Sequence, residues 1–369
     1  MAETDFGALT STQKTVWAMK TWQQGRDQSF WFQTKLIGEN DNSPVQRITE
    51  LTPTDSGDKC IMQLVADLIG DGVAGDNILE GNEESLVNDD FELMIDQLRN
   101  AAKSKGRMAQ QRVVVKFREQ AKGKLAFWLG DKMDELAFLT IAGRSFTLKT
   151  DGSTRSNSQL SQLAFAAQVS APSTDRIMYA GGVAAVGSLT ATDKMSWDLV
   201  VEACAKAKRS KIRPIRMGGK DYYILVMSTE QFRDLKMDAD YRAAVQNGGS
   251  RGPKNPMFTG ESAVVDGVFV YEHNKVCNTL GLTSGSKWGA GGAIDGAQAQ
   301  LIGAQALGMA TIDKVFWNES DNTDFGNKRG VAVGRMFGLA KPVLKTSEDS
   351  TKQDFGTISI FTAAAAQAA

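Results

Sequence analysis

Apolar and polar residues alternate with a period of two in two stretches of the chain, one beginning at Cys60 and the other at Phe91. Successive side chains of a strand point to opposite faces of a sheet, so this alternation predicts two β-strands. Between them, residues 70–85 read GDGVAGDNILEGNEES and are rich in turn formers. The pattern therefore predicts an extended hairpin within residues 44–106. A two-stranded hairpin is marginally stable alone in water, so we expect it to rest on another surface.

A helical period follows the hairpin. Over residues 107–142 apolar side chains recur every three or four positions, which predicts one long helix about 50 Å in length. Gly143 is a natural stop for this helix, and Lys132 interrupts its apolar stripe. The stripe consists of Val114, Phe117, Ala121, Leu125, Trp128, Leu129, Leu136 and Leu139.

Beyond this helix, the composition and the pattern of apolar residues change twice. Residues 144–195 are rich in Ser, Thr, Gly, Asn and Ala and predict irregular structure with short strands. From Ser196 onward the pattern alternates between helices and strands. We expect helices at 196–209, from Ser228 or Thr229 to 236 and at 239–246, strands at 222–227, 263–272, 331–343 and 357–361, and a small-residue segment at 297–311.

The first 43 residues are polar but carry several large aromatic side chains, among them Trp17, Trp22 and Trp31. A helix is expected at 11–24, with Thr10 or Ser11 near its cap. These aromatic side chains are too many for so short a segment to bury by itself. Two interpretations stand side by side: an arm that lies on another surface, and a segment that packs on its own domain.

Two charge blocks of opposite sign adjoin each other. Residues 67–96 hold ten acidic and no basic side chains, whereas residues 97–132 hold ten basic and two acidic ones. Opposite blocks can set the register between copies of one chain, since a wrong register brings like charges together. We expect inter-subunit contacts that involve Asp76, Glu80, Glu83, Glu84, Arg107, Arg112, Lys116, Arg118, Trp17 and Trp22. The alternative is that each block is neutralised within its own subunit or by solvent ions.

The overall composition narrows the class of protein. The formal net charge of −1 argues against a dedicated duplex-DNA binder, which usually presents a net basic surface. There is no basic, apolar leader and no apolar run long enough to cross a membrane. Cys60, Cys204 and Cys277 are far apart and odd in number, which favours reduced, buried thiols in a cytoplasmic protein.

Catalytic and cofactor motifs are missing. His273 is the single histidine, GxSxG is absent, and the stretch at 289–296 places Ile294 where a dinucleotide-binding loop needs its third glycine. We therefore predict no enzyme activity, no cofactor and no metal site. The acidic loop does not match a calcium-loop spacing, so a solvated or partner-facing surface is favoured over a cation site. The basic run 206–220 could bind phosphates, but a solvated helix end is the favoured interpretation.

Several stretches resemble the major capsid proteins of tailed bacteriophages, in particular a podovirus-type family. The most specific is GDGVAGDNILEGNEES at 70–85 followed by IDQLR at 95–99. Supporting stretches are YYILVMSTEQFRDLK at 222–236, NPMFTG at 255–260, DGVFVYEH at 266–273 and IGAQA at 302–306. The resemblance extends over most of residues 70–310.

The resemblance implies the α+β fold shared by tailed-phage and herpesvirus shells. Its parts would be an N-terminal arm (1–43), an extended loop (44–106), a peripheral domain (107–195) with a spine helix at 107–142, an axial domain (196–325), and return strands to the peripheral domain with a tail (326–369).

The implied function is self-assembly into hexamers and pentamers of an icosahedral shell around double-stranded DNA, in the host bacterial cytoplasm. The implied partners are other copies of the chain, portal, scaffold and decoration proteins, and DNA through weak non-specific contacts, with no membrane. Residues 1–43 are too short and aromatic to be a removable scaffold, so scaffolding is expected from a separate protein. The alternative function is a DNA-associated nucleoprotein that uses residues 206–220. A metabolic α/β enzyme is disfavoured because no catalytic constellation is present.

Overall fold

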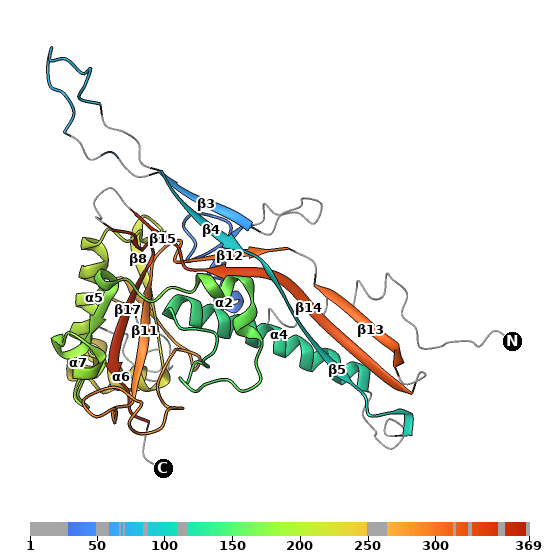
Figure 1. The fold of residues 1–369 in the computed structure, drawn as a ribbon. Coiled ribbons are helices and arrows are strands. Elements are labelled where there is room, and N and C mark those ends of the chain that lie inside the picture. The colour runs from blue at the N-terminus through green and yellow to red at the C-terminus, as the bar shows by residue number, and fades with distance from the viewer. Residues whose placement is uncertain are drawn as a thin grey trace.

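The structure is a computed structural model in which a body of two β-sheets carries a long projecting hairpin (Figure 1). It describes residues 29–48, 59–65, 68, 71–83, 88–108, 117–248, 264–312, 315–323, 327–345 and 351–366, with only the backbone at 63–65, 118, 247–248 and 321–323. The helix expected at 11–24 lies outside these residues.

The first sheet is built around one long strand, β14 (Lys328–Ala340), whose length lets it pair with different neighbours along its course. Residues 330–337 pair antiparallel with β5, residues 328–334 with β13, and residues 337–340 with β12. The sheet has six strands in all. The others are β1 (Ile37–Gly38), β2 (Val45–Ile48), β5 (Asp96–Lys103), β12 (Leu307–Thr311) and β13 (Phe316–Thr323).

Helix α4 (Phe117–Ala142) lies along β14 and covers one face of this sheet (Figure 1). Its Leu129, Leu136 and Leu139 are fully buried, as the helical period predicted. The helix ends at Gly143, whose φ of +66° favours glycine, and a Cβ there would lie 2.3 Å from the carbonyl oxygen of Ser170. Residues 107–108 are also helical, while 109–116 lie outside the described residues.

The second sheet has seven strands and is covered on both faces. In β8, Ile224 and Val226 pack into the core shared with α4, whereas Leu225 and Met227 pack into the core shared with α5. Strands buried on both faces show continuous apolar runs, which is why this part of the sequence lacks strict alternation. The strands are β6 (Ile177–Tyr179), β17 (Thr357–Ala363), β11 (Gly296–Ile302), β8 (Lys220–Met227), β10 (Val268–Glu272), β9 (Val264–Val265) and β7 (Ile215–Met217).

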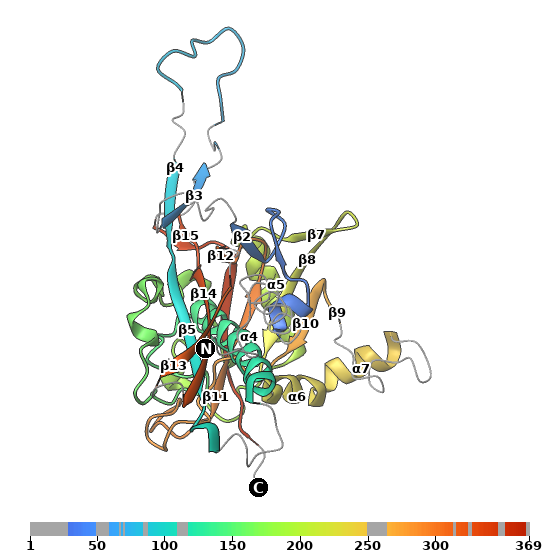
Figure 2. The ribbon, with the colours of Figure 1, turned by 90° about the vertical axis from the view of Figure 1, so that its right-hand side faces the viewer.

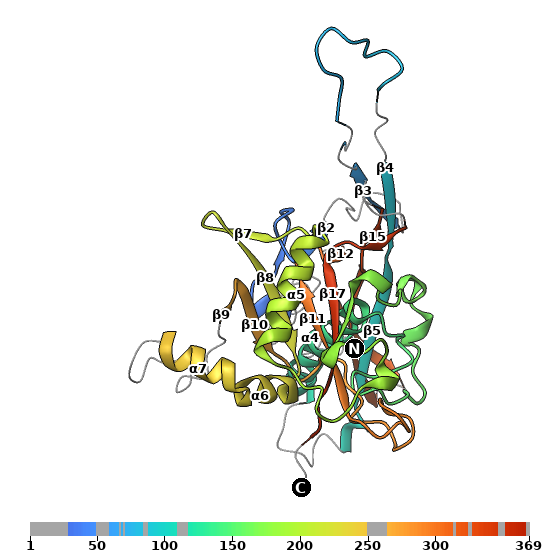
Figure 3. The same cartoon turned by 90° about the vertical axis from the view of Figure 1, so that its left-hand side faces the viewer.

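Two helices pack against the second sheet, and a third extends outward beyond the second of them (Figures 2 and 3). Ser196 caps the first by accepting a hydrogen bond from the Leu199 amide. Ser228 and Gln231 form a capping box at the second, which confirms the start predicted there. These helices are α5 (Trp197–Arg209), α6 (Thr229–Met237) and α7 (Ala239–Gly248).

The segment 144–195 is largely irregular, as its composition predicted, and it holds one short strand, β6, and five short 3₁₀ turns. The turns are η1 (Leu160–Gln162), η2 (Ala164–Gln168), η3 (Thr174–Arg176), η4 (Ala180–Gly182) and η5 (Val186–Ser188). The remaining elements are the short helix α2 (Phe30–Gln33), the hairpin strands β3 (Lys59–Val65) and β4 (Asn88–Met94), and the small pair β15 (Val343–Leu344) and β16 (Gln353–Asp354).

The pairing of the late strands differs from the expected segmentation. β14 lies beside the long helix, as residues 326–369 were expected to do, but β17 lies in the second sheet between β6 and β11. Conversely, β12 and β13 belong to the expected axial segment 196–325 and yet pair with β14. β17 pairs with β11 along one edge and with β6 along the other, and this central position buries all seven of its residues.

Candidate assembly surfaces

The projecting hairpin has very little core of its own. β3 and β4 pair antiparallel from Lys59↔Met94 to Val65↔Asn88, which confirms the predicted strand pair. Among its described side chains, Cys60 and Leu93 are the buried ones, and they pack against Ala310 and Ala340. On the other face Ile61 is 54% exposed. The hairpin therefore leaves apolar surface in solvent beyond its base.

The described part of the acidic loop, residues 71–83, extends beyond the hairpin strands and away from the body (Figures 1 and 2). Ile78 and Leu79 are 74% and 60% exposed, side by side. The loop is shaped by its own hydrogen bonds: Asn77 Nδ2 donates to the Ala74 carbonyl at 2.7 Å, and Asn82 Nδ2 donates to the Ile78 carbonyl at 3.0 Å. The loop thus presents two apolar side chains to its surroundings.

Polar contacts from distant parts of the sequence fasten β4 to the body at both ends of the strand. Gln168 brackets the end of β4, because its Nε2 donates to the Glu92 carbonyl and its Oε1 accepts from the Met94 amide. Asp89 accepts from the Lys352 ammonium at 2.6 Å and from the Lys345 amide at 2.8 Å. The hydrogen bond from Lys352 holds the pKa of the Asp89 carboxyl below its usual value. These contacts set the direction in which the hairpin leaves the body.

A second fastening fixes the point where residues 1–28 join the body. The buried Asp134 of α4 accepts from Ser29 Oγ at 2.5 Å and from the Phe30 amide at 2.7 Å. Burial raises the pKa of the Asp134 carboxyl, while these hydrogen bonds act in the opposite direction. The rings of Phe30 and Trp31 pack on Phe138, with centroids 5.7 and 5.1 Å away. This end of the expected arm therefore packs on its own domain.

The expected contact residues are only partly within the described residues. Asp76, Glu80 and Glu83 are exposed in the acidic loop, and the Arg107 amide donates to Asn327 Oδ1 at 3.2 Å. Arg118 lies in α4 with only its backbone described. The single chain brings none of these acidic and basic side chains together in a hydrogen bond or ion pair that the described residues record. Glu84, Arg112, Lys116, Trp17 and Trp22 lie outside the described residues.

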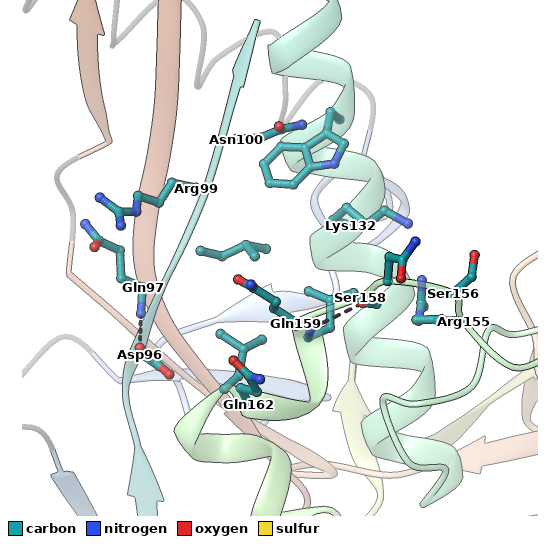
Figure 4. Close-up of a pocket in the computed structure, with 15 residues that line it drawn as sticks. Asp96, Gln97, Arg99, Asn100, Lys132, Arg155, Ser156, Ser158, Gln159 and Gln162 are labelled. Atoms are coloured by element: carbon teal, nitrogen blue, oxygen red, sulfur yellow. Dashed lines mark hydrogen bonds between the residues drawn. The ribbon is translucent and has the colours of Figure 1, made fainter.

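A polar groove of about 720 Å³ separates β5, α4 and the loop that precedes η1 (Figure 4). Lys132 and Arg155 both pair with Glu135, so the interruption of the apolar stripe at Lys132 is explained by an ion-pair network. Asp96, which also lines the groove, accepts from the Ala164 amide at 2.8 Å. Figure 4 shows Arg99 on the side of β5 that is turned away from Lys132 and Arg155. Asp96, Lys132 and Arg155 are therefore engaged within the chain.

The basic run 206–220 is split by the fold. Lys206 Nζ donates to the Ile177 carbonyl at 2.6 Å, and burial lowers its pKa. Lys206, Lys208 and Arg209 form the last turn of α5, where cations are favourable, as the helix-end interpretation predicted. Arg216 pairs with Asp221 at 3.3 Å. The run therefore contributes partly to folding and does not form one continuous phosphate-binding strip.

The other candidate chemistry is accounted for as follows. Cys60, Cys204 and Cys277 are free and buried, as predicted. His273 follows β10 and stacks on Phe138, with ring centroids 4.9 Å apart. The described residues contain no group of three or more side chains placed to hold a metal ion. Within the same ranges, no helix has both the length and the hydrophobicity needed to cross a bilayer.

The sequence matches the family of phage capsid proteins over residues 3–366. It is 41% identical to the major capsid protein of Pseudomonas phage KPP25, and the match covers 98% of this chain and 98% of that protein. The chain belongs to the phage capsid protein family.

Solved structures agree with the assignment of this chain to the phage capsid protein family. The capsid of Ralstonia phage GP4 superposes with a TM-score of 0.75 at 26% identity, covering 93% of each chain. The capsid of cyanophage Pam1 superposes with a TM-score of 0.74 over 100% of this chain and 97% of that one; at 17% identity this likeness concerns the fold alone. The expected mixed α+β capsid fold is confirmed.

The function of the capsid protein is structural. As a phage major capsid protein it assembles with copies of itself into the icosahedral shell of a virion. The resemblance carried by the acidic loop and its flanking strand therefore identified the family correctly. Sequence reasoning did not find Asp89, Gln168 or Asp134 as fastening residues, because their partners lie 74 to 263 positions away in the chain.

Proposed function

We propose that the capsid protein forms hexamers and pentamers that close around packaged double-stranded DNA in the cytoplasm of a host bacterium, and that the hairpin is its main inter-subunit element. The observation that carries the second part is the exposed apolar surface of the hairpin, at Ile61, Ile78 and Leu79. Burying a large aliphatic side chain contributes about 1.5–3 kcal/mol, so a neighbouring subunit that covers these residues gains a substantial driving force.

The hairpin contacts a neighbouring subunit over much of its length. β3 and β4 pair only with each other among the described strands, and a lone hairpin is marginal in water. The contacts of Gln168 and Asp89 fasten β4 to the body and give the hairpin a fixed direction, which lowers the entropy lost when it docks.

The segment before Ser29 forms an arm that makes further inter-subunit contacts through Trp17 and Trp22. The hydrogen bonds of Ser29 and Phe30 to Asp134 fix where this segment leaves the body. Scaffolding comes from a separate protein, and the portal and a decoration protein are further partners. Contacts with DNA are weak and non-specific, because the net charge of the chain is −1.

Electron microscopy with sedimentation tests the assembly proposal directly. Protein co-expressed with its phage's scaffold should yield closed particles of megadalton size with six-fold and five-fold clusters of subunits. Small oligomers that bind DNA in a strongly salt-dependent way would contradict it and favour the alternative nucleoprotein function. Intact-mass measurement on the particles checks the scaffold statement: a chain that begins well after residue 50 would contradict it.

A further inference from the structure

Two of the chain crossings between the sheets lie against each other. In the first, residues 303–306 lead from β11 of the second sheet to β12 of the first. In the second, the chain leaves β14 of the first sheet, passes through β15 and β16, and enters β17 of the second sheet. The Gly303 amide donates to the Gly356 carbonyl at 2.8 Å, so the crossings are hydrogen-bonded to each other. We call residues 303–306 and 353–356, together with Lys341, the joint.

The joint is closely packed around Gly356. A Cβ added to this glycine would lie 2.7 Å from the Ala306 Cα and 2.8 Å from the Ala304 carbonyl oxygen. The two backbones therefore approach each other at a distance that only glycine permits. Neither crossing can shift without disturbing the other.

A buried ion pair spans the joint. Lys341 Nζ and Asp354 Oδ2 are 2.8 Å apart, and both side chains are 1% exposed. Lys341 directly follows β14 of the first sheet, whereas Asp354 ends β16 and lies three residues before β17 of the second sheet. Burial lowers the pKa of Lys341, and the charge and hydrogen bond of Asp354 oppose that shift. The pair therefore connects the end of one sheet's central strand to the start of a strand in the other sheet.

Asp354 also holds the segment that precedes β6, the neighbour of β17 in the second sheet. The Ser173 hydroxyl donates to Asp354 Oδ1 at 3.1 Å, and the Ser173 amide donates to Oδ2 at 3.2 Å. Arg176 Nε donates to the Asp354 carbonyl at 3.1 Å. One aspartate thus ties the starts of β6 and β17 to the end of β14.

A buried ion pair acts on the choice of conformation more than on net stability. Removing two charges from water offsets much of their mutual attraction, whereas separating the partners leaves two uncompensated charges in the interior. Lys341 is attached to the first sheet and Asp354 to the second. A change in the angle between the sheets would separate the two side chains, so every other angle carries that penalty.

We propose that Lys341 and Asp354 are positioning residues for shell assembly, because they hold the two sheets of each subunit at one angle. Whether repeated contacts between copies close into a shell depends on the rotation from one copy to the next. A variable angle within the subunit changes that rotation, and the error accumulates over many copies. This inference starts from shell formation and does not depend on which surface the hairpin contacts.

Neutralising the pair tests the proposal. Lys341→Met with Asp354→Asn removes both charges and nearly conserves side-chain volume. The asparagine oxygen can still accept from the Ser173 amide, and its NH2 group can donate to Ser173 Oγ. Urea unfolding of free subunits should give a stability close to that of the native chain. Particles formed with the phage's scaffold should instead show a spread of diameters at least about twofold wider in electron micrographs, or fail to close.

Two further variants serve as controls. Lys287→Met with Asp295→Asn makes the same chemical change at a pair 2.5 Å apart, but both partners lie in the loop between β10 and β11. This variant should leave the spread of diameters unchanged. Lys341→Arg keeps the charge opposite Asp354 and should also give the native spread.

Each outcome decides for or against the positioning role. A native spread of diameters from Lys341→Met with Asp354→Asn would overturn it. A large loss of urea stability in that variant would also overturn it, because the pair would then stabilise the subunit without selecting an angle. A wider spread from either control would show that charge pairing across the joint is not the cause. Native chains that form no shell would contradict the proposed function instead.

Discussion

The β3–β4 and β11–β17 pairs have the same antiparallel backbone pairing, but they differ in how far their side chains are buried. Each joins two seven-residue strands antiparallel through seven residue pairs. Every residue of β11 and β17 is buried, whereas in β4 only Leu93 is buried. The identical ladder shows that hydrogen bonding does not distinguish them. The side chains of β11 and β17 are buried within their own chain, whereas the hairpin keeps exposed apolar surface at Ile61.

The largest difference in stability between the body and the hairpin is expected when one buried and one exposed ion pair are removed. In the body, Lys341 follows β14 and pairs at 2.8 Å with Asp354 of β16, and both side chains are 1% exposed. Lys341→Met leaves a buried carboxylate uncompensated and should lower the free energy of unfolding by about 3–5 kcal/mol. In the hairpin, Lys59 pairs with Glu92 at 3.2 Å with about half of each side chain exposed, so Lys59→Ala should cost less than about 1 kcal/mol. Urea unfolding of free subunits measures both; equal losses would contradict the contrast.

The next largest difference in subunit stability is expected between two matched substitutions of isoleucine by alanine. Ile360 of β17 is fully buried, so Ile360→Ala should destabilise the free subunit by about 2–5 kcal/mol. Ile61 of β3 is 54% exposed, so Ile61→Ala should change stability by less than about 0.5 kcal/mol while lowering particle yield. Thermal unfolding and particle yield are the two measurements. A large stability loss from Ile61→Ala would mean that the hairpin is already packed in the free subunit.

A pH titration tests the body separately from the hairpin, because the single histidine of the chain, His273, lies in the body. Burial lowers the pKa of His273 to about 4 from 6.5, with Lys275 lowering it further and Asp131 opposing. A depressed folded pKa contributes stability that is present above pH 6.5 and is lost as the pH falls toward 4. The unfolding free energy should therefore drop more steeply over this window in the native chain than in His273→Gln. Parallel slopes in urea unfolding would show that His273 titrates normally.

The smallest expected effect on folding, though not on assembly, comes from charge reversal in the acidic loop. Glu83→Lys with Glu84→Lys should change subunit stability by less than about 0.5 kcal/mol and block assembly. Arg112→Glu with Lys116→Glu in the same chain should partly restore particles. Circular dichroism and electron microscopy read the two properties separately. Normal shells from the first variant alone would rule out this pairing of charge blocks.

Local sequence signals predicted much of the fold. The alternation through Cys60 and Phe91 predicted β3 and β4, the helical stripe predicted α4 and its end at Gly143, and Ser228 predicted the start of α6. These elements follow from side-chain periodicity and capping, which act over a few residues.

Elements determined by distant partners were missed. β13 reads FWNESDNT, and its Asn, Asp and Ser residues disfavour a strand, yet pairing with β14 imposes one. The fastening of Ser29 to Asp134 joins residues 105 positions apart, and no local pattern announces it.

Amide hydrogen exchange in free subunits and in assembled particles tests the central claim most directly. Peptides that cover β3, β4 and residues 71–83 should exchange at least about tenfold more slowly in particles, because the neighbouring subunit then covers them. Peptides that cover β11 and β17 should change little, since their burial is complete within one chain. Equal exchange of the hairpin peptides in the two states would contradict the account.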